Sequence, residues 1–226
     1  MTSTDSFDNA LWYTRCPVPT PLGIAVQRGW IAEEFAPDGL ELRSLQETSD
    51  PAARESHFDH TLPASFRQGG NIPALWARSR GRQTRLIGLS WTDEFQAIVT
   101  RRGSGISTPT DLNGRRIGLP VNPVSIDFNR ASALRGFAKV LERAGLALDT
   151  VERVDVTAGP PAAGPSGISW GNDGRAPRRG GYAAEVAALA AGEVDAIYVK
   201  GAPGAEIAAR DDFAAVASFG FDPDPA

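Results

Sequence analysis

The amino-acid sequence predicts an α/β protein that folds as two successive lobes, each with a mostly parallel sheet. Short apolar runs alternate with segments of helical periodicity along the chain, which is typical of parallel α/β sheets. The composition then resets to a polar, turn-forming stretch just after residue 100. The length of 226 residues suffices for two modest buried cores. We therefore expect a first lobe over residues 1–100 and a second over residues 101–226.

The first lobe contains four apolar runs and two segments with helical spacing. The strands are expected at residues 11–16, 39–42, 85–90 and 95–100. The helices are expected over residues 21–35 and 72–78. Leu22, Ala25, Trp30 and Phe35 are available for a buried face of the first helix, and Pro73 suits the first turn of the second.

The second lobe begins with a polar turn, a short helical turn and a strand, all within residues 104–120. A helix follows, because Leu134, Phe137, Ala138 and Leu141 recur at helical spacing. This helix is expected over residues 134–146. The remaining elements are expected to be a strand at residues 151–156, an alanine-rich helix at 182–191 and a strand at 194–199.

Residues 157–181 are rich in glycine and proline and have almost no apolar periodicity. Segments of this kind that exceed about 12–15 residues are often either lids or disordered stretches. Both readings fit the composition. The isolated Trp170 favours a lid that places one aromatic ring over a site.

The charge and the composition argue against several classes of protein. With 23 basic and 27 acidic side chains, the net charge of −4 disfavours nucleic acid and anionic membranes as partners. No stretch approaches the ~18 consecutive apolar residues of a membrane span, and the N-terminus carries acids where a signal peptide has basic residues. We therefore expect a cytoplasmic protein. The single cysteine, Cys16, leaves no partner for an intramolecular disulfide and disfavours structural zinc.

Three short segments carry candidate functional residues. Cys16 is at the end of the first expected strand, and ligands bind at the carboxyl ends of strands in α/β sheets. A small buried side chain is the alternative for this cysteine. A neutral His57 could poise a thiol, whereas a protonated one could stabilise a thiolate. The guanidinium of Arg67 suits an oxyanion, and Gly69–Gly70 precede an expected helix N-terminus whose N–H groups could face the same anion.

These segments resemble the 2′-hydroxybiphenyl-2-sulfinate desulfinase family. The resemblance rests on YTRCPVP, on SHF and on an arginine followed by x-Gly-Gly-x-Ile-Pro. It continues through TRLIGL, DLNGRRIGLP and GEVDAIY, which are similar to a wider group of periplasmic-binding-protein-like sequences. The resemblance implies a two-lobed, type II periplasmic-binding-protein-like α/β sandwich. Since the chain ends at FDPDPA, a C-terminal return segment to the first lobe is expected to be missing.

The resemblance also implies roles for individual residues. Cys16, His57 and Arg67 would be catalytic, and the backbone of Gly69 and Gly70 would help to hold the sulfinate oxygens. His60 and Trp170 would contact the substrate. The chain departs from the family at His60 and Leu62, where the family has tyrosine and glutamine. The expected substrate is 2′-hydroxybiphenyl-2-sulfinate or, if these two positions line the aryl pocket, a relative of it.

The expected function is therefore hydrolysis of the carbon–sulfur bond of an aromatic sulfinate, with release of sulfite. Cys16 would act either as nucleophile or as proton donor, without a metal or an organic cofactor. We expect a monomer whose partners are the sulfinate and water, with no nucleic acid and no membrane. The main alternative is a solute-binding protein of an ABC transporter for sulfonate or a similar anion. A thiamine-pyrimidine-type enzyme would need more histidines than His57 and His60.

Overall fold

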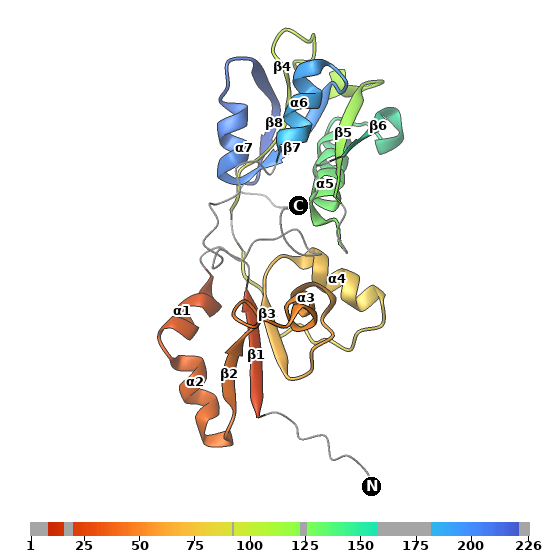
Figure 1. Ribbon diagram of the computed structural model, residues 1–226. Coiled ribbons are helices and arrows are strands. Elements are labelled where there is room, and N and C mark those ends of the chain that lie inside the picture. Colours follow the sequence, from red (N-terminus) through yellow and green to blue (C-terminus); the bar gives the residue numbers. More distant parts are fainter. Residues whose placement is uncertain (1–8, 16–19, 92, 123–125, 158–181, 222–226) are drawn as a thin grey trace. The chain divides into compact units, whose positions relative to one another are not determined.

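The computed structural model describes residues 9–15, 20–91, 93–122, 126–157 and 182–221. The chain divides into two compact units, with the boundary between Leu86 and Ile87 (Figure 1). Each unit has its own sheet. The strand β4 (Gln96–Arg101), which the expected division assigns to the first lobe, pairs with strands of the second unit.

The first unit contains a three-stranded parallel sheet in the order β2-β1-β3. Its strands are β1 (Ala10–Arg15), β2 (Glu41–Ser44) and β3 (Ser65–Gln68). Its helices are α1 (Pro21–Gln27), α2 (Trp30–Phe35), the 3₁₀ helix η1 (Ala36–Asp38), α3 (Pro51–Asp59) and α4 (Asn71–Ser79).

The second unit contains a five-stranded mixed sheet in the order β6-β5-β7-β4-β8, in which β4 runs antiparallel to both of its neighbours. Its other strands are β5 (Arg116–Val121), β6 (Glu152–Thr157), β7 (Ala196–Lys200) and β8 (Phe213–Phe219). Its helices are η2 (Pro109–Leu112), α5 (Phe128–Arg143), η3 (Leu148–Thr150), α6 (Ala183–Ala191) and α7 (Gly201–Ala208).

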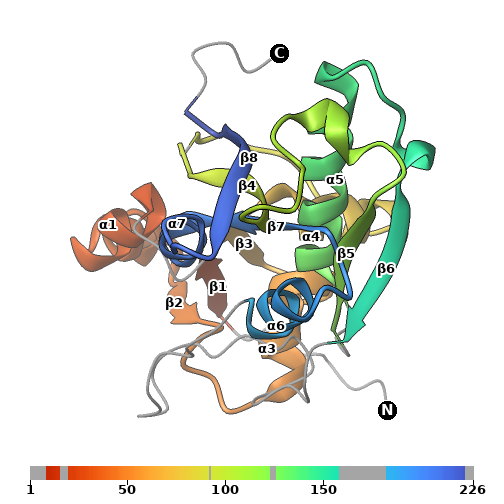
Figure 2. The same cartoon turned by 90° about the horizontal axis from the view of Figure 1, so that it is seen from above.

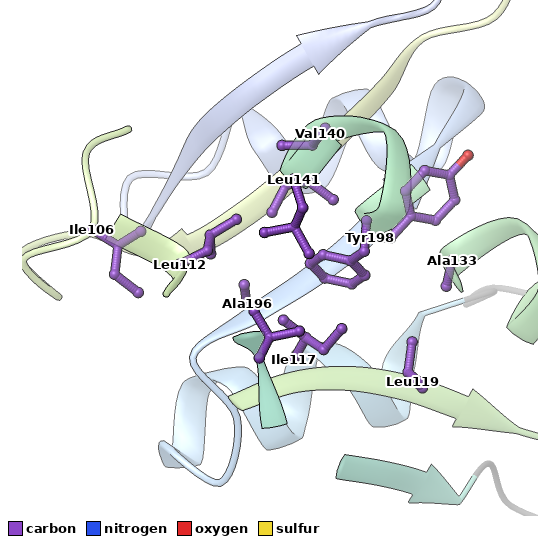
Figure 3. Close-up of a cluster of buried hydrophobic side chains, with 12 residues drawn as sticks. Ile106, Leu112, Ile117, Leu119, Ala133, Val140, Leu141, Ala196 and Tyr198 are labelled. Atoms are coloured by element: carbon purple, nitrogen blue, oxygen red, sulfur yellow. The ribbon is translucent and has the colours of Figure 1, made fainter. Parts of the chain in front are cut away.

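Successive residues of the central strands alternate between two cores, one on each face of this second sheet. Ile98 and Tyr198 face α5, whereas Val99 and Val199 face the side of α6 and α7 (Figure 2). In the first core, Tyr198 lies among aliphatic side chains (Figure 3). A Cβ at Gly136 of α5 would lie 2.4 Å from the Tyr198 ring, so only glycine lets the helix approach this closely.

The helix expected over residues 21–35 is in fact two helices. Gly29 adopts a left-handed conformation with φ of 80° and is the N-cap of α2. This change in backbone direction separates α2 from α1. The expectation of a buried face is also wrong. Neither helix has a fully buried residue, and Trp30 is 58% exposed.

The strand expected at residues 85–90 does not form. No described strand lies beside this run, and its backbone groups therefore have no ladder to join. Leu86, Ile87, Leu89 and Trp91 are at least 70% exposed. The sequence reasoning also missed two α-helices and two strands, namely α3, α7, β3 and β8, and the short 3₁₀ helices η1 and η3. Apart from Thr157, the expected lid lies outside the described residues.

Candidate functional site

The helix α3 of the first unit supplies the buried histidine of the candidate site. The Asp50 carboxylate accepts a hydrogen bond from Ala52 N at 2.9 Å, and Pro51 occupies the first turn, so the start of the helix is well defined. The helix ends where His60 turns left-handed, with φ of 52°. The four buried residues of α3 form its inward face: Ala53, Ser56, His57 and Phe58.

The His57 ring has contacts at both nitrogens. Its Nδ1 lies 2.7 Å from Oγ1 of Thr14 on β1, and its Nε2 lies 3.4 Å from Nη2 of Arg67 on β3. The Phe58 ring meets it edge-on, with 4.6 Å between the centroids. Since His57 is only 1% exposed, these neighbours rather than water determine its orientation.

The protonation state of His57 follows from these surroundings. Burial lowers the pKa of its imidazole to about 2, and the positive charge of Arg67 and the nearby His60 act in the same direction. The ring is therefore neutral around pH 7. Of the two possibilities that the sequence left open, the structure favours the neutral histidine over an imidazolium that pairs with a thiolate.

The pairing of β1 with β3 brings Arg67 to this histidine. Thr14 and Arg67 are direct partners across the parallel ladder, so their side chains project from the same face of the sheet. The Arg67 guanidinium also donates from Nη1 to the Gly70 carbonyl at 3.0 Å. Gly70 is the N-cap of α4, and a Cβ placed on it would meet no atom within 4 Å. Gly69 and Gly70 are both exposed.

His60 lies at the edge of the same cluster. Burial lowers the pKa of its imidazole, the charge of Arg67 lowers it further, and Asp59 acts in the opposite direction. Its Nε2 is buried and has no hydrogen-bond partner among the described residues. The structure thus brings His57, His60, Arg67 and Gly70 together in one unit.

Two predicted site residues, Cys16 and Trp170, lie outside the described residues. In the sequence, Cys16 follows directly after Arg15, the last residue of β1. The residue that sequence reasoning missed is Thr14, which is 1% exposed. Thr14 lies two residues before Cys16 on an expected strand, which was the one indication of a role in the sequence. Its partner His57 is 43 residues further along the chain, so the sequence alone does not reveal their contact.

Among the described residues of the second unit, Glu185 has a buried carboxyl group. Glu185 lies in the first turn of α6, is 5% exposed, and borders a cavity of about 10 Å³ together with Tyr182 and Tyr198. Burial raises the pKa of Glu185 and the negative charge of Asp127 raises it further, against a hydrogen bond from its own backbone N–H.

The described residues form neither a metal-binding cluster nor a membrane-spanning helix. Across the parts of the chain that the structure describes, no group of three or more His, Cys, Asp or Glu side chains could hold a metal ion. Within the same ranges, no helix is sufficiently long and apolar to span a membrane.

Comparison with known sequences shows that the chain is similar to a desulfinase and to a sulfonate-binding protein. The sequence model of the family described as "NMT1/THI5 like" matches residues 17–161, more than half of the chain. The 2′-hydroxybiphenyl-2-sulfinate desulfinase of Rhodococcus erythropolis is 35% identical over 121 residues, which are 52% of this chain and 31% of the desulfinase. A Bacillus subtilis protein described as binding aliphatic sulfonates is 30% identical over 102 residues, 44% of this chain and 30% of that protein. The matches thus span less than a third of either relative.

Comparison with solved structures identifies the fold. The complex of biphenyl-2-sulfinic acid with a cysteine-to-serine mutant of the enzyme DSZB has a TM-score of 0.59 and 26% identity. The likeness covers 94% of this chain and 65% of that one. Solved periplasmic sulfonate-binding proteins have the same fold. The expected periplasmic-binding-protein-like type II class is therefore confirmed.

Proposed function

Because this chain belongs to the NMT1/THI5-like family, we propose that it is a desulfinase, which hydrolyses the carbon–sulfur bond of an aromatic sulfinate and releases sulfite. The observation that carries this proposal is the contact of a buried, neutral His57 with Arg67 beside the Gly69–Gly70 turn. The desulfinase relative and the biphenyl-2-sulfinic acid complex give the proposal its substrate class.

The chemistry of an anion site supports this choice of substrate. A sulfinate carries two oxygens that share one negative charge, and the planar fork of a guanidinium can donate to both. Arg67 supplies the fork. The N-terminus of α4, a nine-residue helix, directs backbone N–H groups toward the same turn. In the proposed complex, Arg67 and the backbone around Gly70 therefore bind the sulfinate oxygens.

Cys16 is proposed to carry the chemical step by one of two routes. In the first, its thiolate attacks the sulfinate sulfur, the ring carbon takes a proton as the carbon–sulfur bond breaks, and water cleaves the resulting S–S bond to release sulfite and the thiol. In the second, the Cys16 thiol protonates the ring carbon, sulfur dioxide leaves, and its hydration gives sulfite and returns the proton to the thiolate. Either route converts one sulfinate and one water into one arene and one sulfite.

Incubation with 2′-hydroxybiphenyl-2-sulfinate and with biphenyl-2-sulfinate tests the proposal. We expect sulfite and the matching arene in equal amounts, and no turnover in Cys16→Ser. The two substrates differ only in the hydroxyl group, so their relative rates also show how the pocket accommodates this substituent. Absence of sulfite with both compounds, from a protein that is folded by circular dichroism, would contradict the desulfinase assignment.

A second candidate function is binding of a sulfonate without chemistry, which the relative that binds aliphatic sulfonates favours. The same anion site would serve, because a sulfonate presents one more oxygen to Arg67 and the backbone. Calorimetric titration with alkanesulfonates separates the two functions. Tight binding of these compounds, together with no sulfite release from aryl sulfinates, would identify a binding protein.

A further inference from the structure

We propose that Thr14 is a positioning residue, which orients Arg67 for oxyanion binding by fixing the tautomer of His57. The inference deepens the proposed function and rests on it for the identity of the oxyanion. Its starting point is a continuous line of three side chains within the first unit. Thr14 Oγ1 lies 2.7 Å from His57 Nδ1, and His57 Nε2 lies 3.4 Å from Arg67 Nη2.

The chemistry of the guanidinium determines which atom is the donor and which is the acceptor in each of these two contacts. An arginine side chain has five N–H donors and no acceptor, and it does not lose its proton in proteins. The group that faces Arg67 Nη2 must therefore offer a lone pair, so His57 Nε2 is unprotonated. In a neutral imidazole, the remaining ring proton is then on Nδ1. Nδ1 donates this proton to Thr14 Oγ1, which is the acceptor.

Burial makes the tautomer dependent on Thr14. Thr14 and His57 are each 1% exposed, so water cannot replace the threonine hydroxyl as acceptor. Without that hydroxyl, the buried Nδ1–H would lose the acceptor that lies 2.7 Å away, which is costly. The ring would then favour a proton on Nε2, where it would face the Nη2–H of Arg67. Two donors cannot share a hydrogen bond, and the guanidinium would lose its support from His57.

The expected consequence is weaker oxyanion binding with the charge of Arg67 unchanged. Arg67 contacts His57 through Nη2 and the Gly70 carbonyl through Nη1. Loss of the His57 contact weakens the constraint on the guanidinium, whose orientation must match two sulfinate oxygens. His57 therefore acts through Arg67, and Thr14 acts through His57.

Three threonine variants test the inference. Thr14→Val keeps the shape of the side chain but removes the acceptor, and Thr14→Ser keeps the hydroxyl. Thr100→Val is the matched control, because Thr100 on β4 is also fully buried and its Oγ1 has no hydrogen-bond partner among the described residues. Binding of biphenyl-2-sulfinate is measured by calorimetry, and the tautomer of His57 by nitrogen-15 NMR, with His60→Gln used to assign the two histidines.

The wild type is expected to carry its imidazole proton on Nδ1 at pH 7. Thr14→Val should shift the proton toward Nε2 and weaken binding by about fivefold or more, the value of one hydrogen bond. Thr14→Ser should restore both properties, and Thr100→Val should leave both unchanged. A wild-type proton on Nε2, or unchanged binding in a folded Thr14→Val protein, would overturn the inference.

The tautomer measurement also keeps this inference separate from the proposed function. If Thr14→Val does not fold, the wild-type spectrum and the Thr14→Ser variant still decide the question. If the wild type releases no sulfite, the desulfinase proposal fails. The position of the proton and its dependence on Thr14 can be read without any turnover.

Discussion

At the scale of single residues, the site depends on one uncharged ring between a hydroxyl group and a cation. Burial and the guanidinium both lower the pKa of His57, to about 2. In the free protein, the His57 ring therefore stays neutral throughout the pH range in which enzymes are assayed. Any bell-shaped dependence of turnover on pH belongs to other groups, with Cys16 the first candidate under the proposed mechanism.

The Arg67→Lys variant tests the geometry of the anion site at this scale. Charge is retained, but an ammonium cannot donate in parallel to two sulfinate oxygens, and it cannot span His57 and the Gly70 carbonyl. We expect turnover of biphenyl-2-sulfinate to fall by about tenfold or more, the equivalent of ~1.4 kcal/mol. Arg210→Lys, in an exposed ion pair with Asp212, is the control and should have normal activity. Near-normal turnover of Arg67→Lys would exclude a bidentate role.

At the scale of elements, three short helices begin at polar or glycine residues that matter for the site or for stability. The start of α3 is fixed by Asp50, and Gly70 caps α4 beside the site. In the second unit, the first turn of α6 buries Glu185. A carboxylate near a helix N-terminus is usually favourable, yet this one is almost fully removed from water and repelled by Asp127.

The buried Glu185 predicts a pH-dependent stability of the second unit. Its pKa is raised in the folded state, so the protonated form stabilises the fold. The stabilisation is complete below the ordinary carboxyl pKa and is lost as pH rises through the raised value. Glu185→Gln should therefore flatten this pH dependence, because the glutamine amide does not titrate. Hydrogen exchange of the β7 amides between pH 5 and 8 measures it.

The control for this measurement is Glu193→Gln, because Glu193 follows the same helix but is less deeply buried than Glu185. This variant should keep the wild-type pH dependence. An equal change in the two variants would mean that the effect arises from net charge rather than from the burial of Glu185.

At the scale of the whole molecule, the apolar interior is unevenly distributed. Both large hydrophobic clusters among the described residues lie in the second unit. In the first unit, the buried apolar side chains within the described ranges are few and mostly small: Ala10, Leu45, Ala53, Phe58, Pro73 and Ala77. Because burial of apolar area is the main source of stability, the two units should differ in their free energies of unfolding.

We therefore predict that the units lose structure in sequence on heating. Amides of β1 and β3 should exchange faster than those of β4, β5 and β7, and denaturation should proceed in two steps, with the tryptophan signal changing first. Three of the five tryptophans, Trp12, Trp30 and Trp76, lie among the described residues of the first unit, so the tryptophan signal reports mainly on that unit. A single transition, with equal protection in both sheets, would contradict this uneven stability.

The sequence predicted the fold class and most strands, because apolar runs and the Leu134–Leu141 periodicity are local signals. It missed α3, since two of the four residues on the inward face of that helix, Ser56 and His57, are polar and show no apolar period. It missed β3 because this strand has only four residues, of which Phe66 alone has a large apolar side chain, so the segment shows no recognisable apolar alternation. The role of Thr14 depends on strand pairing, which no local pattern reveals.

The pairing of Thr14 with Arg67 also determines which changes in chain length the site can tolerate. Residues 47–49 lie between the buried Leu45 and Asp50, the N-cap of α3, and outside the line of contacts from Thr14 through His57 to Arg67, so insertions there should leave that geometry intact. A single residue inserted in Ser65–Gln68 would instead turn Arg67 to the opposite face of the sheet. In the evolution of such proteins, gaps should therefore gather before α3 and be excluded from β1 and β3, even where the amino acids themselves vary.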